Sequence, residues 1–128
     1  MSSFFLPKND EHVSGSIVSQ QNVDQSKKIK VTLKSLQDIC NYFGDETIDV
    51  LKMDIEGAEY DVIRGFNEHK IRPHQLLVEL HGRLFPDQPI IDKNALSCLR
   101  ENGYRLFNIS DSFQEASFIH ETAINRIT

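Results

Sequence analysis

Four acid–base side chains follow two apolar runs of this chain, and their types suit proton transfer or the orientation of a hydroxyl group. Asp54 and Glu56 come after the first run, and Glu79 and His81 end the second in the same way. A carboxylate or imidazole beside a reacting hydroxyl can accept its proton, and the reference pKa of histidine, about 6.5, suits that work. We therefore treat these four residues as the candidate catalytic set.

The runs that precede these residues have the length and composition of buried β-strands. They cover residues 48–53 and 75–80 and are rich in Ile, Leu, Val and Met. Such runs are typical of parallel strands that are covered on both faces. Ligands of open α/β sheets bind at the carboxyl ends of the strands, so neighbouring strands would bring the four side chains to one edge. We call Asp54, Glu56, Glu79 and His81 the rim.

Each rim residue also has a structural interpretation that the sequence leaves open. Asp54 could cap the helix that follows, and Glu56 lies where the positive end of that helix favours negative charge. For Glu59, a structural role in the first turn is favoured over a chemical one. His81, as a lone histidine after a strand, could be a hydrogen-bonded surface residue.

Three helices are predicted from apolar residues that recur at intervals of three and four. Their ranges are 33–43, 58–67 and 93–102. Thr32 and Asp92 are the expected N-caps of the first and third helix, and Gly44 and Gly103 follow their ends. Together with the two strands, these helices predict an α/β fold.

The two ends of the chain differ in pattern. Strands are predicted at 104–109 and 116–119, and they could pair antiparallel across the polar turn between them. Residues 8–30 are rich in Asn, Asp, Ser, Gln and Lys, which indicates a loop or weakly ordered segment. We therefore divide the chain into a loop or weak-strand region, 1–30, and an α/β part, 31–128.

The end of the first apolar run carries a spaced set of charged residues and a glycine. It reads Lys52-x-Asp54-x-Glu56-Gly57-x-Glu59. This motif resembles the signature of the FkbM-type methyltransferases, a branch of the S-adenosylmethionine-dependent class I methyltransferases. Further segments are similar to the family's neighbouring strands and helices, namely 4–7, 12–16, 31–33, 73–81 and 98–107. The resemblance covers almost the whole chain.

The resemblance implies a fold, a cofactor and a reaction. The fold would be a partial Rossmann-like sheet of parallel strands with a C-terminal antiparallel pair. S-adenosylmethionine would be the cofactor, with Asp54 and Gly57 beside it, and the acceptor would be a hydroxyl oxygen of a small molecule or sugar. Asp54, at the end of the central strand, is the leading candidate for the base that such an acceptor needs.

A class I methyltransferase begins with a strand and a glycine-rich loop under the cofactor, and these 128 residues contain no such loop. No two glycines have the G-x-G spacing. We therefore expect only the C-terminal half of a family domain, binding S-adenosylmethionine weakly or not at all and inactive in isolation. The first run would then have an unpaired edge that favours self-association. The alternative is a degenerate, non-catalytic module that binds a partner through the rim.

Composition and net charge disfavour some classes of partner and location. The net charge of −5 with dispersed Lys and Arg disfavours nucleic acid, and no apolar run approaches the roughly 20 residues of a membrane span. Cys40 and Cys98 are expected to be buried free thiols, and residues 1–7 do not resemble a signal peptide, so we expect a cytoplasmic protein. Asp54, Glu79 and His81 could hold a divalent ion, but without a tight ligand motif metal independence is expected.

Overall fold

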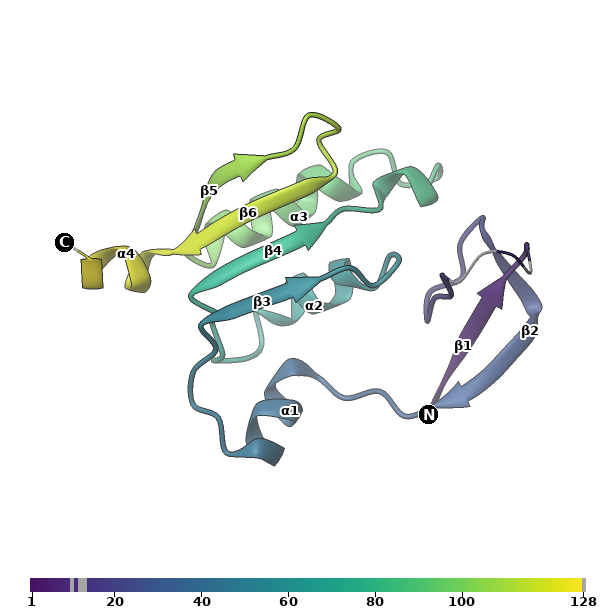
Figure 1. Cartoon of the computed structure of the whole chain (residues 1–128), viewed down its shortest axis with the longest axis horizontal. Helices are drawn as coiled ribbons and strands as arrows, with labels where there is room; N and C mark the ends of the chain where they lie inside the picture. The colour runs from purple at the N-terminus through teal and green to yellow at the C-terminus, as the bar shows by residue number, and fades with distance from the viewer. Residues whose placement is uncertain (10, 12–13, 128) are drawn as a thin grey trace.

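The computed structural model describes residues 1–9, 11 and 14–127 and contains two β-sheets and four α-helices in that part of the chain (Figure 1). His12 and Val13, which belong to one of the resembling segments, lie outside the described residues. The strands are β1 (Ser2–Pro7), β2 (Val23–Val31), β3 (Val50–Met53), β4 (Gln75–Glu79), β5 (Tyr104–Ile109) and β6 (Glu115–His120). The helices are α1 (Leu36–Phe43), α2 (Glu59–Gly65), α3 (Ile91–Glu101) and α4 (Glu121–Ile127), with a 3-10 turn η1 (Gly82–Leu84).

The larger sheet is mixed, with the strand order β3-β4-β6-β5. β3 and β4 are parallel and in register, since Val50 lies opposite Gln75 and Met53 opposite Val78. β6 runs antiparallel to both β4 and β5. The predicted antiparallel pairing of the last two strands is therefore confirmed, and β3 and β4 end at the same edge of the sheet.

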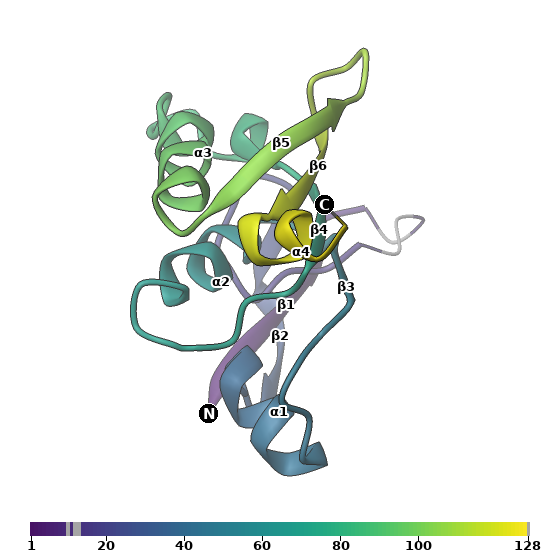
Figure 2. The same cartoon turned by 90° about the vertical axis from the view of Figure 1, so that its left-hand side faces the viewer.

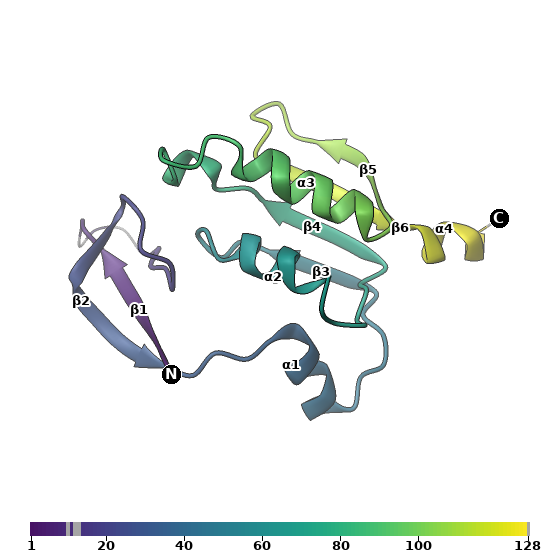
Figure 3. The ribbon, with the colours of Figure 1, turned by 180° about the vertical axis from the view of Figure 1, so that it is seen from behind.

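Helices α2 and α3 cover one face of this sheet, as the views from behind and from the side show (Figures 2 and 3). The core lies between these helices and the strands, where Ile63, Leu76 and Leu99 are fully buried. Along β4 the burial alternates, because Leu76 and Val78 face the helices while Leu77 is only half-buried. The expectation that β3 and β4 are covered on both faces is thus wrong for the described residues. The two strands have apolar residues at more positions than the burial of one face requires.

The N-terminal region is more ordered than predicted. β1 and β2 form a two-stranded antiparallel sheet of their own, with Phe4 opposite Ile29. From Val23 onward, the region predicted as a loop or weak strand is a β-strand. The side chains of residues 25–30 are all exposed, so backbone pairing carries this strand and no apolar alternation marks it in the sequence.

Helix starts differ from the prediction because other side chains take the cap positions. α1 begins at Leu36 rather than residue 33, since Ser35 and Asp38 form a reciprocal capping box in place of a Thr32 cap. The third helix begins at Ile91, and Asp92 lies inside its first turn. Gly44 and Gly103 do end their helices, with φ of 75° and 87°.

The cysteines and two short helical elements differ in part from the prediction. Both cysteines are free, but only Cys40 is buried, while Cys98 is half-buried. Helix α4 and turn η1 were not predicted. None of the helices in the described part of the chain is long and apolar enough to cross a lipid bilayer.

Candidate functional site

The structure brings all four rim residues together around the ring of His81. The Nε2 atom of His81 lies 3.8 Å from Asp54 Oδ1, 3.7 Å from Glu56 Oε2 and 3.6 Å from Glu79 Oε1. The parallel register of β3 and β4 explains this convergence, because their carboxyl ends stop side by side. The histidine side chain is only 1% exposed, whereas Asp54 is 44% exposed and is the most open member of the rim.

A fifth residue, Glu59, holds the other side of the histidine. Its Oε1 atom accepts hydrogen bonds from the backbone N–H and from Nδ1 of His81, each at 3.0 Å. Its Oε2 atom accepts from the backbone N–H of Gly57, also at 3.0 Å. Glu59 is completely buried in the first turn of α2. Glu59, for which a structural role was favoured, thus orients His81, and no pattern in the sequence indicates this partner.

The charge state of His81 follows from two opposing effects. Burial lowers its pKa, because desolvation disfavours the charged ring. The hydrogen bond and negative charge of Glu59, with the charges of Glu56 and Glu79, outweigh burial and raise the pKa above its ordinary value. The rim therefore stabilises a positive charge at the histidine.

A tight turn between β3 and α2 returns Glu56 toward the histidine. Glu56 and Gly57 both have positive φ, 51° and 103°. The Ser16 hydroxyl fastens the turn by donating a 2.7 Å hydrogen bond to the backbone oxygen of Glu56. A Cβ atom at Gly57 would approach the Phe85 ring to 2.6 Å, so only glycine fits this contact without a shift.

The alternative role of Asp54 as a helix cap is not supported by the geometry. Ala58 holds the N-cap position of α2, and no side chain caps that helix by a hydrogen bond. The amide that the turn offers, at Gly57, is taken by Glu59. The Asp54 carboxylate is therefore not used as a cap and lies beside His81 in the rim.

Behind the rim, a hydrogen-bonded pair joins α2 to α3, with Tyr60 buried and Asp92 half-buried. The Tyr60 hydroxyl donates a 2.6 Å hydrogen bond to Asp92 Oδ1, which accounts for the failure of Asp92 to act as a cap. Burial, and then this bond, raise the pKa of Tyr60. Beside the rim, Arg83 Nη2 lies 3.5 Å from Glu79 Oε1. Neither Tyr60 nor Asp92 was predicted from the sequence as part of the site.

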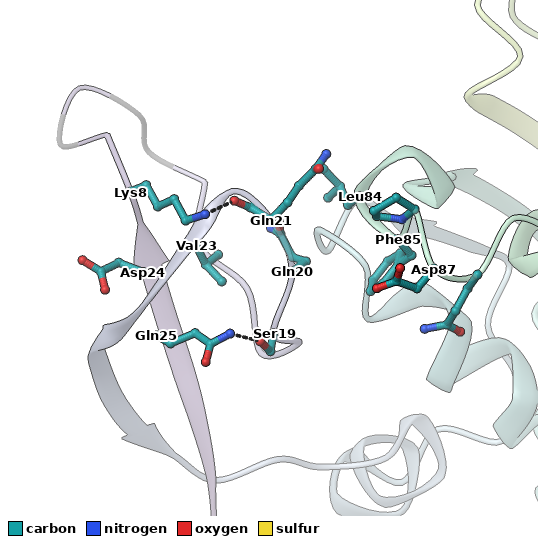
Figure 4. A pocket seen from close by; sticks show the side chains of 12 residues that line it. Lys8, Ser19, Gln20, Gln21, Val23, Asp24, Gln25, Leu84, Phe85 and Asp87 are labelled. Atoms are coloured by element: carbon teal, nitrogen blue, oxygen red, sulfur yellow. Dashed lines mark hydrogen bonds between the residues drawn. The ribbon is translucent and has the colours of Figure 1, made fainter.

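Two hollows adjoin this arrangement. One, of about 430 Å³, opens beside Asp54 and Glu56 and is walled by Phe4, Gly15 and Ile17. The other, of about 500 Å³, lies between β2 and the segment after η1 (Figure 4). Its polar groups bind each other: the Lys8 amine reaches the Gln21 carbonyl, and the Gln25 amide donates to Ser19 Oγ at 2.8 Å. The hollow beside Asp54 and Glu56 is therefore the better candidate to hold a reacting group.

Comparison with known families decides the assignment. The family model for the methyltransferase FkbM domain matches residues 2–106, which is most of the chain and includes every rim residue. The chain belongs to the FkbM methyltransferase family. Searches of curated proteins and of solved structures returned no match. Membership indicates a methyltransferase.

Proposed function

We propose that this FkbM-family chain supplies the acceptor side of an S-adenosylmethionine-dependent O-methyltransferase site, located at the rim. Its acceptor would be a hydroxyl group of a small molecule or sugar. The observation that carries the proposal is the convergence of three carboxylates on His81 at the ends of two adjacent parallel strands. Family membership supports the methyl-transfer reaction.

We further propose that the sheet β3-β4-β6-β5 is the later part of a Rossmann-like sheet. Its parallel pair followed by an antiparallel strand agrees with that arrangement, and β3 has one edge without a partner strand among the described residues. Beside this edge lies an apolar groove of about 520 Å³ between α1 and α2, lined by residues such as Leu36, Leu51 and Phe66. A cofactor-binding half would join the sheet along this edge and cover the groove.

The rim residues have distinct roles in the proposed reaction. Bound S-adenosylmethionine would supply an electrophilic methyl group, which transfers to the acceptor oxygen as its bond to sulfur breaks. Asp54, the most exposed rim acid, accepts the hydroxyl proton, and Glu79 orients the acceptor. Glu56 is held toward the same point by the turn. Gly57 contributes through the shape of that turn, since its amide is bonded to Glu59.

Methyl transfer can be measured with a labelled methyl donor and a panel of sugars and small alcohols. The chain alone is expected to bind S-adenosylmethionine weakly, because it has no glycine-rich loop. Co-expression with the glycine-rich half of a complete FkbM methyltransferase should give transfer. Asp54→Asn should then reduce turnover about a hundredfold without changing the melting temperature.

Asp49→Asn is the matched control, because Asp49 lies at the opposite end of β3 and pairs with His74 at 3.3 Å. It should leave turnover unchanged. If the combined halves bind the donor but transfer no methyl group, the catalytic proposal fails and a non-catalytic binding module is favoured. If Asp54→Asn lowers the melting temperature while activity per folded molecule is unchanged, Asp54 is structural.

A further inference from the structure

The orientation of the His81 ring is fixed by Glu59. A carboxylate only accepts hydrogen bonds when ionised, so the Nδ1 atom that lies 3.0 Å from Glu59 Oε1 carries a hydrogen. The other nitrogen, Nε2, is therefore directed at the three carboxylates of the rim. In the described part of the chain, no group hydrogen-bonds to Nε2.

Nε2 is also reachable from solvent. Every fully enclosed polar side-chain atom of the described residues has a hydrogen-bond partner, so Nε2, which has none, keeps some exposure. The His81 side chain as a whole is nevertheless almost completely buried, since only 1% of its surface is exposed. A buried imidazole thus presents one nitrogen to an opening lined by acids.

The spacing of the rim atoms suits a shared ion better than hydrogen bonds. The three carboxylate oxygens lie 3.6 to 3.8 Å from Nε2, which is beyond hydrogen-bond length. Two atoms that bind one ion at about 2.1 Å each are about 3.4 Å apart in tetrahedral geometry. The ligand atoms of Asp54, Glu56 and His81 all lie within 4.8 Å of one another.

We propose that the rim binds one divalent transition-metal ion, through His81 Nε2 and the carboxylates of Asp54 and Glu56. One nitrogen and several oxygens favour Mn²⁺ or Zn²⁺ over Mg²⁺ and Ca²⁺, which prefer oxygen alone. The hydrogen bond from His81 Nδ1 to Glu59 is the outer contact by which proteins orient a histidine ligand.

The local charge agrees with this proposal. Four carboxylates lie within 4 Å of the His81 ring, and Arg83 reaches only one of them, Glu79. The site therefore has an excess of negative charge that a bound cation would offset. The expectation of metal independence rested on the absence of a compact linear motif, whereas these ligands follow two different strands and are 27 residues apart, counted from Asp54 to His81.

The metal site rests on geometry and not on the proposed methyl transfer. Only its use would rest on that function: an ion at this place would lie beside the acceptor oxygen and favour its loss of a proton. Metal binding can be measured without a methyl donor, so failure of one proposal leaves the other open to its own test.

The experiment is a titration of the purified, chelator-treated chain with Mn²⁺, followed by calorimetry and by the loss of the free-ion electron paramagnetic resonance signal. We expect one ion per chain and a rise in melting temperature on binding. Asp54→Asn and Glu56→Gln, whose side chains are partly exposed, should each weaken binding at least tenfold. Asp49→Asn, in the acid–histidine pair at the other end of β3, should not.

Glu59→Gln tests the positioning contact, and it should weaken Mn²⁺ binding about tenfold while the three proposed ligands remain. Circular dichroism of every variant confirms that it is folded. The proposal is overturned if neither Mn²⁺ nor Zn²⁺ binds at millimolar concentration, which would mean that protonated His81 alone balances the acids. It is also overturned if Mn²⁺ binding is unchanged by Asp54→Asn and Glu56→Gln.

Discussion

Glu59 accepts hydrogen bonds from both the backbone N–H and Nδ1 of His81, although 22 residues separate the two in the chain. The contact joins the first turn of α2 to the segment after β4 and is completely buried. It makes Glu59 the residue on which the geometry of the whole rim depends.

Glu59→Ala should lower the free energy of unfolding by about 3 kcal/mol, because it leaves buried donors of His81 and Gly57 without an acceptor. Urea denaturation measures this change. Glu56→Gln is the control, since Glu56 is only partly buried and its carboxylate makes no hydrogen bond in the described structure; it should cost less than 1 kcal/mol, about the size of an exposed ion pair. Equal losses in the two variants would contradict the central position of Glu59.

Gly57→Ala and Gly44→Ala separate backbone strain from steric contact. Both glycines have positive φ, but a Cβ at Gly44 would meet nothing within 4 Å, while one at Gly57 would meet Phe85 at 2.6 Å. We expect a loss of about 1 kcal/mol at Gly44 and about 3 kcal/mol at Gly57. Thermal unfolding of the two variants gives the comparison, and a loss at Gly44 as large as that at Gly57 would show that the Phe85 contact is unimportant.

The capping box of α1 should make stability depend on pH in the acid range. The side-chain hydrogen bond from Ser35, followed by its backbone N–H, lowers the pKa of Asp38 below its ordinary value. A lowered folded-state pKa adds stability above the unfolded value, about 3.9, and that stability is lost as pH falls through the folded value. Because Asp38 is fully exposed, the effect is small.

Ser35→Ala removes that hydrogen bond, so the difference in stability between the parent chain and this variant should shrink as the pH falls below about 4. Urea unfolding at a series of pH values measures it. A difference that stays constant from neutral to acid pH would mean that the cap acts without the ionised carboxylate.

The free edge of β3 should make the chain associate with itself. β1 and β2 pair with each other and not with β3, so the N-terminal region does not complete this sheet. Val50 on the edge strand is 52% exposed. Sedimentation at increasing concentration should show dimers or larger species, and Val50→Lys should reduce them, because a charge at an edge opposes strand addition.

Ile90→Lys is the control for this variant, since Ile90 is 58% exposed and lies at the start of α3, outside the strands. It should leave association unchanged. A monomer at high concentration, or an equal effect of both lysines, would point away from the edge of β3.

The sequence predicted those parts of the fold that depend on local pattern. β5 occupies the predicted residues 104–109, and the rim residues meet because parallel strands align their carboxyl ends. Contacts between distant segments were not predictable: Tyr60 draws Asp92 away from a cap position, and Glu59 finds its partner across β4. β2 was predicted only as part of a loop or weak-strand region, because the side chains of residues 25–30 are exposed and carry no apolar alternation.

The left-handed backbone conformation at Glu56 lowers the stability of the chain, but it keeps a carboxylate in the rim. Glutamate in that conformation costs roughly 1 kcal/mol, and glycine there would relieve the strain at the loss of the carboxylate. Selection or design for thermal stability alone would therefore replace Glu56 and empty the rim of one acid, leaving a sturdier chain with an incomplete site. A glutamate that persists at this turn in related chains would mark descent under selection for the site itself.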